Sequence, residues 1–178
     1  MRRLGDMSFS EQMIATEVRP PKSYMREVFA ATGLALCIGV VLFATMSPAP
    51  LDQGYSSSIE RLLGVLHRNG VPTWFGYNRL EFSANVLMFM PVGFLLTLLL
   101  PKRAWWLAIL MCLGLSGAIE YTQSVLLTER FATILDVIAN SSGGVIGVIL
   151  AVMIQSIVHA RDEKLIARAL WDHAARRR

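Results

Sequence analysis

Four long apolar runs dominate the pattern of hydrophobic and polar positions along the chain. The first, from Val28 to Met46, carries no charged residue, and a run of roughly 20 apolar residues matches a ~30 Å hydrocarbon core. The others run from about Phe82 to Leu100, from Trp105 to about Leu127, and from about Ile134 to Val158. This pattern predicts an all-α integral membrane bundle of about four transmembrane helices.

A signal peptide is the competing interpretation of the first run. However, 27 residues precede the run, and no clear small-x-small cleavage site follows it. These features favour a first transmembrane helix over a leader that is removed.

The segments outside the runs have helical patterns of their own. Ser57 and Glu60 fit a capping box, apolar residues follow at helical spacing, and Asn69-Gly70 with Pro72 should end the helix. We expect an amphipathic helix in the first outer loop, lying on the membrane surface. The C-terminal segment mixes apolar and basic residues, which indicates either a second surface helix or a solvated helix that ends in Arg-rich coil.

Composition agrees with a membrane protein, since 54% of the residues are hydrophobic, 17% are charged and the mean hydropathy is +0.48. Thirteen of the 17 Lys and Arg residues precede the first run, follow the second or follow the fourth. By the positive-inside rule these segments are cytoplasmic. We therefore expect a multi-pass protein of the cell membrane with a cytoplasmic N-terminal tail (1–27), a membrane domain (28–158) and a basic cytoplasmic C-terminal tail (159–178).

The distribution of cations also bears on partners. The basic residues do not form one patch, so nucleic acid is not an expected partner, whereas membrane lipids are. An oligomer is compatible with the pattern. Cys37 and Cys112 both fall inside apolar runs and are interpreted as small core residues.

Polar residues within the runs need a reason, because an ionisable group in a span costs roughly 2.5–3.5 kcal/mol. Glu120 lies 15 residues after Trp105, about 22 Å along the helix, and is therefore in the outer half of its span. The same estimate of depth places six polar residues near the outer face: Asn85, Glu120, Gln123, Arg130, Asp136 and Asn140. Helical spacing groups them with small and polar residues on shared faces: Ser116 with Glu120 and Gln123, Asp136 with Asn140 and Gly144, and Asn85 with Phe89 and Gly93.

Structural roles are open for most of these residues. Asp136 follows Thr133 by three positions, so the two fit the N-cap and N3 positions of the fourth helix. The amides fit interhelical hydrogen bonding, Arg130 fits an interfacial anchor, and Pro91 fits a kink. Gly143 and Gly147 form a GxxxG motif, while Gly114 and Gly117 are expected to let the third helix approach a neighbour closely. Glu120 has no comparable structural explanation.

The order of these residues resembles the signature of the VanZ-like family. The matching positions are Asn85-x-x-x-Phe89-x-Pro91-x-Gly93, Glu120-x-x-Gln123, Arg130, and Asp136-Val137-x-x-Asn140-x-x-Gly143-x-x-x-Gly147. The resemblance implies a polytopic protein of the cell envelope, in a family whose founding member is associated with resistance to the antibiotic teicoplanin. Some members carry an acid where this chain has Thr133. Two carboxyls remain, which disfavours a carboxylate-rich metal centre, and no cofactor is expected.

Three hypotheses for function follow. The first is a non-enzymatic envelope protein whose outer-leaflet polar pocket, covered by the amphipathic loop, binds a polar or lipid-linked ligand such as a cell-wall precursor. The alternative is a small membrane enzyme that uses Glu120 and Asp136 in acid–base chemistry on a lipid-linked substrate, with Arg130 on its phosphate. No Ser/His or Cys/His pair and no Gly-rich phosphate loop supports the enzyme. A transporter would require oligomerisation.

Arg130 is tethered ten residues from Glu120 and six from Asp136. We expect Glu120 to be buried against Arg130 or the fourth helix, so that Arg130→Gln and Glu120→Gln are coupled in a double-mutant cycle.

The four-span topology is testable by labelling. Cysteines introduced at Ser57 and at Ala175 should react from opposite sides of the membrane, because an odd number of crossings separates them. A membrane-impermeant maleimide applied from outside should label only the cysteine at position 57. The unsubstituted chain, which carries its native Cys37 and Cys112, gives the background labelling. Labelling of both positions from one side would contradict the topology.

Overall fold

The computed structural model describes residues 24–46, 56–126 and 133–176. These residues are almost entirely helical, and four of the helices are long and apolar enough to cross a membrane. The predicted all-α membrane bundle is therefore confirmed. Its elements are α2 (Met25–Met46), α3 (Ser56–Arg68), α4 (Tyr77–Leu99), the short 3-10 helix η2 (Lys102–Ala104), α5 (Trp105–Leu126) and α6 (Ile134–Ala175).

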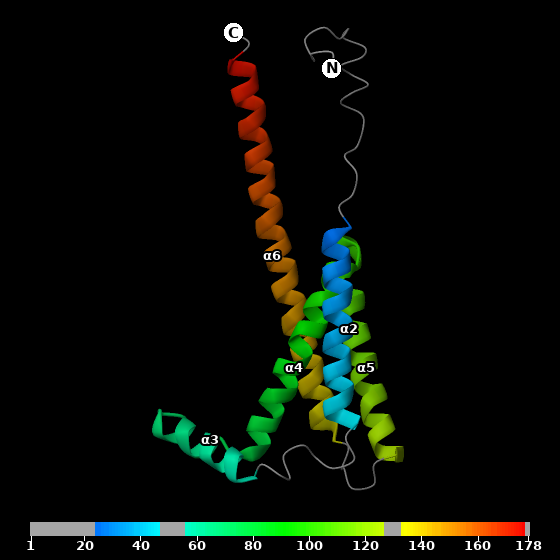
Figure 1. Ribbon diagram of the computed structural model, residues 1–178, viewed down its shortest axis with the longest axis vertical. Helices are drawn as coiled ribbons and strands as arrows, with labels where there is room; N and C mark the ends of the chain where they lie inside the picture. Colours follow the sequence, from blue (N-terminus) through cyan, green and yellow to red (C-terminus); the bar gives the residue numbers. More distant parts are fainter. Residues whose placement is uncertain (1–23, 47–55, 127–132, 177–178) are drawn as a thin grey trace.

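The bundle consists of α2, α4, α5 and the first half of α6, which run side by side (Figure 1). At one end α2 and α5 finish while α4 and α6 begin, and α3 lies beside this end. We call it the α3 end. At the opposite end, α2 begins and η2 joins α4 to α5; we call it the η2 end. The N-terminus of α2 and the C-terminus of α6 both lie toward the η2 end, as an even number of spans requires.

The expected amphipathic helix is present as α3, but it does not cover the polar residues of the bundle. It projects sideways from the start of α4 (Figure 1). Gly70, at φ 94°, follows its end, and His67 Nε2 lies 3.0 Å from the carbonyl oxygen of Phe75. The guanidinium of Arg79 stacks 3.9 Å from the centroid of the Trp74 ring. The turn that contains Trp74 and Phe75 is thus tied to α3 through His67 and to α4 through Arg79, and α3 lies beside the bundle rather than over it.

Glycines bring α4 and α6 into the most extensive helix contact of the bundle. Membrane helices gain little from apolar burial against one another, so close backbone approach through small residues is a main source of attraction. A Cβ added at Gly93, Gly143 or Gly147 would overlap backbone atoms of the facing helix: those of Gly144, Val86 and Met90, respectively. The GxxxG prediction is confirmed at this contact. Helix α4 continues through Pro91.

The glycines of α5 behave differently from the expectation. Gly114 and Gly117 are exposed, and a Cβ at either would meet nothing within 4 Å. The prediction that they allow a close approach is wrong, because their spacing places them on the outward face of α5. The close approach of α5 to α6 occurs instead where Gly144 faces the side chain of Cys112. Cys112 is buried in the core, and Cys37 is half-buried; both are free thiols.

Helix α6 extends well past the expected end at Val158. Its 42 residues span about 63 Å, roughly twice the hydrocarbon thickness. Every side chain from Ser156 to Arg176 is exposed. The C-terminal segment is therefore a straight continuation of the fourth span rather than a separate surface helix (Figure 1). The reason is that neither glycine nor proline occurs after Gly147, so nothing in the backbone stops the helix.

The glycine contact predicts opposite effects for two similar substitutions. Gly147→Ala should lower the free energy of unfolding by about 1–3 kcal/mol, because its Cβ must displace the backbone of α4. Gly114→Ala should leave the stability unchanged or raise it, since alanine favours helix and the site is open. Unfolding in mixed micelles by increasing SDS, followed by circular dichroism, measures both. Equal effects would contradict the proposed role of this contact.

Candidate functional site

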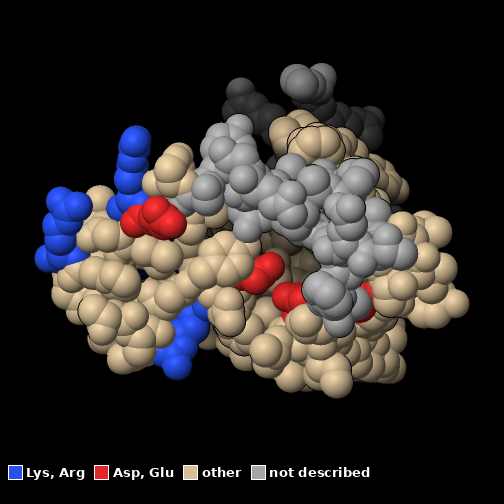
Figure 2. Space-filling model, turned by 90° about the horizontal axis from the view of Figure 1, so that it is seen from below, with Lys and Arg blue, Asp and Glu red and all other residues tan. Residues whose placement is uncertain are grey.

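The described polar candidates lie at the α3 end, at similar depths in different helices. Glu120 is six residues from the end of α5, and Asn140 is six residues from the start of α6, about 9 Å in each case. Asn85 is eight residues into α4, about 12 Å. Figure 2 views this end and shows Asp and Glu side chains toward its middle, with Lys and Arg on the side of α3.

Asp136 joins the start of α6 to α4. Asn85 Nδ2 donates a hydrogen bond of 2.9 Å to Asp136 Oδ1, and Thr133 Oγ1 donates one of 2.7 Å to Oδ2. Thr133 is also the N-cap, since its hydroxyl oxygen accepts from the backbone N–H of Asp136 at 3.3 Å. The predicted N-cap and N3 roles are confirmed, and both oxygens of this half-buried carboxyl are engaged.

A second polar pair joins α6 to α5 deeper in the bundle. Asn140 Nδ2 donates a hydrogen bond of 3.1 Å to Ser116 Oγ. Asn140 is 2% exposed and Ser116 is fully buried. Within the described part of the chain, Asn140 Oδ1 is buried and has no hydrogen-bond partner. An amide oxygen in this state is an acceptor available to a further donor.

Gln123 forms a hydrogen bond with the first span, α2, rather than with the fourth, α6. Its Nε2 donates a hydrogen bond of 2.8 Å to the backbone carbonyl of Thr45 in the last turn of α2. Carbonyls in the last turn of a helix have no donor within the helix, so this bond satisfies one of them. The Thr45 carbonyl is a partner of Gln123 that sequence reasoning missed, because a backbone acceptor leaves no signal in side-chain patterns.

Glu120 lies on the same stripe of α5, between Ser116 and Gln123. Only 9% of the residue is exposed. Because Ser116 reaches α6 and Gln123 reaches α2, the stripe faces the interior of the bundle rather than lipid. A carboxyl is thus held inside a transmembrane helix at the α3 end, as the sequence predicted.

The structure places the predicted residues in separate contacts. Asn85 meets Asp136, Asn140 meets Ser116, and Gln123 meets α2, whereas Arg130 lies outside the described residues. The pairing of Arg130 with Glu120 therefore stays a prediction. The motif residues Phe89, Gly93, Gly143 and Gly147 lie along the α4–α6 contact or in the core beside it, and Pro91 is half-buried within α4.

The model of a protein family described as VanZ/LLP1 matches residues 30–155, well over half of the chain. The chain belongs to the VanZ/LLP1 family. The matched region contains most of α2, all of α4 and α5, and the part of α6 that packs in the bundle. The VanZ/LLP1 region thus includes every candidate residue at the α3 end and stops where α6 leaves the bundle. No curated protein and no solved structure matches the chain.

The hydrogen bond between Asn85 and Asp136 should appear as a coupling energy. Asn85→Ala and Asp136→Ala should each lower the free energy of unfolding. The loss in the double variant should be smaller than the sum of the two single losses by about 0.6–1.7 kcal/mol. Ser83→Ala provides the control, because Ser83 bonds only within its own helix, to the Arg79 carbonyl at 2.8 Å. Additive energies for Asn85 and Asp136 in SDS unfolding would show that the bond contributes nothing.

Proposed function

We propose that the α3 end of the bundle binds the polar head of a lipid or lipid-linked envelope ligand, such as a cell-wall precursor. The observation that carries this proposal is the burial of the Glu120 carboxyl on the inward stripe of α5. Keeping an ionisable group in a span costs roughly 2.5–3.5 kcal/mol, a cost that helix packing alone does not require. Ser116 and Gln123 show that neutral polar groups suffice to join these helices.

The chemistry of the site favours a ligand that donates hydrogen bonds. Glu120 supplies carboxyl oxygens, and Asn140 supplies a buried amide oxygen with no partner among the described residues. Sugar hydroxyls, amide N–H groups and ammonium groups are suitable donors. The exposed apolar faces of the helices offer a surface for the acyl chain of a ligand that stays in the bilayer.

The orientation of the bundle supports an envelope ligand. Thirteen of 17 basic residues belong to segments at the η2 end or to the two tails, which by the positive-inside rule makes that end cytoplasmic. The α3 end then faces outward, where lipid-linked envelope material is assembled. A contribution to teicoplanin-type resistance stays a prediction of the family resemblance.

The hydrogen bonds that Asp136 accepts favour a binding role for the site over acid–base catalysis. A two-carboxyl mechanism requires Asp136 to exchange protons with a substrate, yet both of its oxygens already accept hydrogen bonds from Asn85 and Thr133. Asp136 therefore acts as a structural tie between α4 and α6. We therefore assign the ligand contact to Glu120, the carboxyl buried on the inward stripe of α5.

Replacement of Glu120 tests the proposal. Glu120→Gln keeps the shape of the side chain and removes its charge, so the fold should persist while the affinity for the ligand falls about ten- to hundredfold. Mass spectrometry of the purified protein should find a lipid or glycan precursor with the wild type that is depleted in this variant. Glu60→Gln, which removes an exposed carboxyl on α3, should retain the ligand.

Two outcomes would overturn the proposal. The first is equal retention of the co-purifying ligand by both variants. The second is loss of folded protein in Glu120→Gln together with recovery of it in Arg130→Gln/Glu120→Gln, which would give Glu120 a purely structural role. Unfolding in SDS separates this result from a loss of binding.

A further inference from the structure

A second polar site lies at the η2 end, on the side of the bundle away from Glu120. Two adjoining cavities of about 190 and 250 Å³ share Lys102, Gln155 and His159 in their walls. The first cavity also reaches Trp105, and the second reaches Arg26 at the start of α2. Segments from all four spans therefore contribute to the walls.

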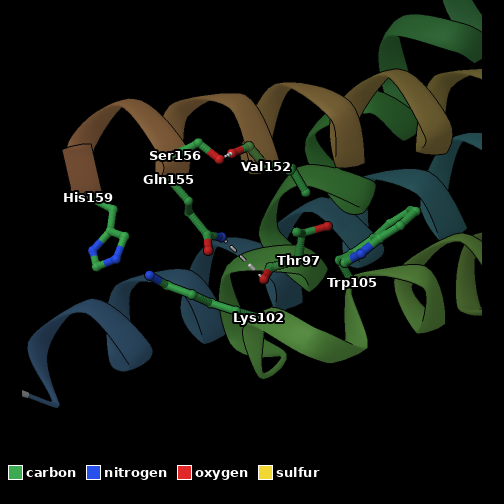
Figure 3. Close-up of a pocket in the computed structure, with 7 residues that line it drawn as sticks. All are labelled: Thr97, Lys102, Trp105, Val152, Gln155, Ser156 and His159. Atoms are coloured by element: carbon green, nitrogen blue, oxygen red, sulfur yellow. Dashed lines mark hydrogen bonds between the residues drawn. The ribbon is translucent and has the colours of Figure 1, made fainter.

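The wall of the first cavity is built around the end of α4. Pro101 has no N–H, so the carbonyl of Thr97 lacks the donor that would continue the helix. Gln155 Nε2 on α6 lies 3.5 Å from this carbonyl and takes the place of that donor (Figure 3). The turn at Pro101 then starts η2 with Lys102, whose side chain extends toward the space between Gln155 and His159 (Figure 3).

The cavities lie at the level of the membrane surface. Helix α2 begins at Met25, α4 ends at Leu99 and α5 begins at Trp105, so three of the four spans have their termini here. From Ser156 onward every described side chain of α6 is exposed. Trp105 and Trp106 are 44% and 49% exposed, as tryptophans at a lipid–water interface are.

The charge of the walls favours an anion. No acidic side chain lines the first cavity among the described residues, and Lys102 is its cation. Arg26 adds a second cation in the adjoining cavity. The acidic residues lie one turn further along α6: Glu163 Oε1 is 3.3 Å from His159 Nε2, and Asp162 is the one acid that lines the second cavity among the described residues.

We propose that these two cavities bind the phosphate of an anionic lipid headgroup. Each is smaller than the roughly 300–1,000 Å³ of a pocket that encloses a whole small molecule, which suits a headgroup whose acyl chains remain in the bilayer. Ile154 and Val158, which line the second cavity and are about half exposed, offer an apolar surface for those chains. Basic sites between spans on the cytoplasmic side are suited to anionic headgroups.

The neighbouring residue Arg103 allows a matched test. Lys102 and Arg103 are consecutive, exposed cations of η2, but only Lys102 lines the cavities. The detergent-solubilised full chain is titrated with phosphatidylglycerol or phosphatidylcholine, and retained lipid is counted by native mass spectrometry. Lys102→Gln should weaken phosphatidylglycerol binding about fivefold, which corresponds to ~1 kcal/mol for one cation. Arg103→Gln and Lys102→Arg should bind as the wild type does.

The controls decide between a specific site, a general surface charge and a soluble anion. An equal loss in Lys102→Gln and Arg103→Gln, or wild-type binding of phosphatidylcholine as tight as that of phosphatidylglycerol, would overturn the proposal. Competition by glycerol 3-phosphate or inorganic phosphate at the concentration of the lipid would assign the site to a free phosphate instead. Because Glu120 lies at the other end, Glu120→Gln should leave this binding unchanged.

Discussion

The close approach of α4 and α6 is the contact on which the rest of the bundle depends. Glycines on both helices allow backbone to meet backbone, which supplies the dispersion attraction that apolar burial does not provide in a bilayer. This approach places Asn85 within 2.9 Å of Asp136. Gly144 opens the same face of α6 to Cys112 of α5, and thereby allows Ser116 to meet Asn140. The two polar contacts of α6 at the α3 end, with Asn85 and with Ser116, therefore depend on glycine packing.

The two ends of the bundle differ in their chemistry. At the α3 end the inward-facing groups include carboxyl and amide oxygens, which accept hydrogen bonds. At the η2 end the charged and titratable side chains that line the cavities are Lys102, Arg26, His159 and Asp162, and cations outnumber the single acid. A donor-rich ligand suits the first end and an anion suits the second. The two ends of the bundle thus differ in the kind of ligand that their polar groups suit.

Much of the fold follows from the sequence because the bilayer imposes simple rules. A span must be apolar, about 20 residues long and hydrogen-bonded within itself, so four helices and their approximate limits could be predicted. The spacing of Gly143 and Gly147 indicated the contact face of α6 for a similar reason. Gly114 and Gly117 do not form a GxxxG motif, and they were misassigned because two nearby glycines do not by themselves show that a helix face meets a neighbour.

The partners of the polar residues were harder to predict. Helical periodicity places Gln123 on the stripe of Glu120, but only the tertiary structure shows that it reaches the carbonyl of Thr45 on α2. The η2 cavities gave no sequence signal, because Arg26, Lys102 and His159 come from distant segments and resemble ordinary interfacial residues. Helix α6 continues past Val158, the predicted end of the fourth span, because a change from apolar to charged composition marks the membrane surface, not the end of a helix.

The length of α6 gives the bundle a mechanical property. From Gly147, where α6 touches α4, to Ala175 the helix has no glycine or proline at which to bend. A change in tilt of about 5° at this contact would therefore move the far end by about 4 Å, given the ~42 Å rise of the intervening residues. The helix acts as a lever whose pivot is the glycine contact and whose far part is the exposed segment after Gln155.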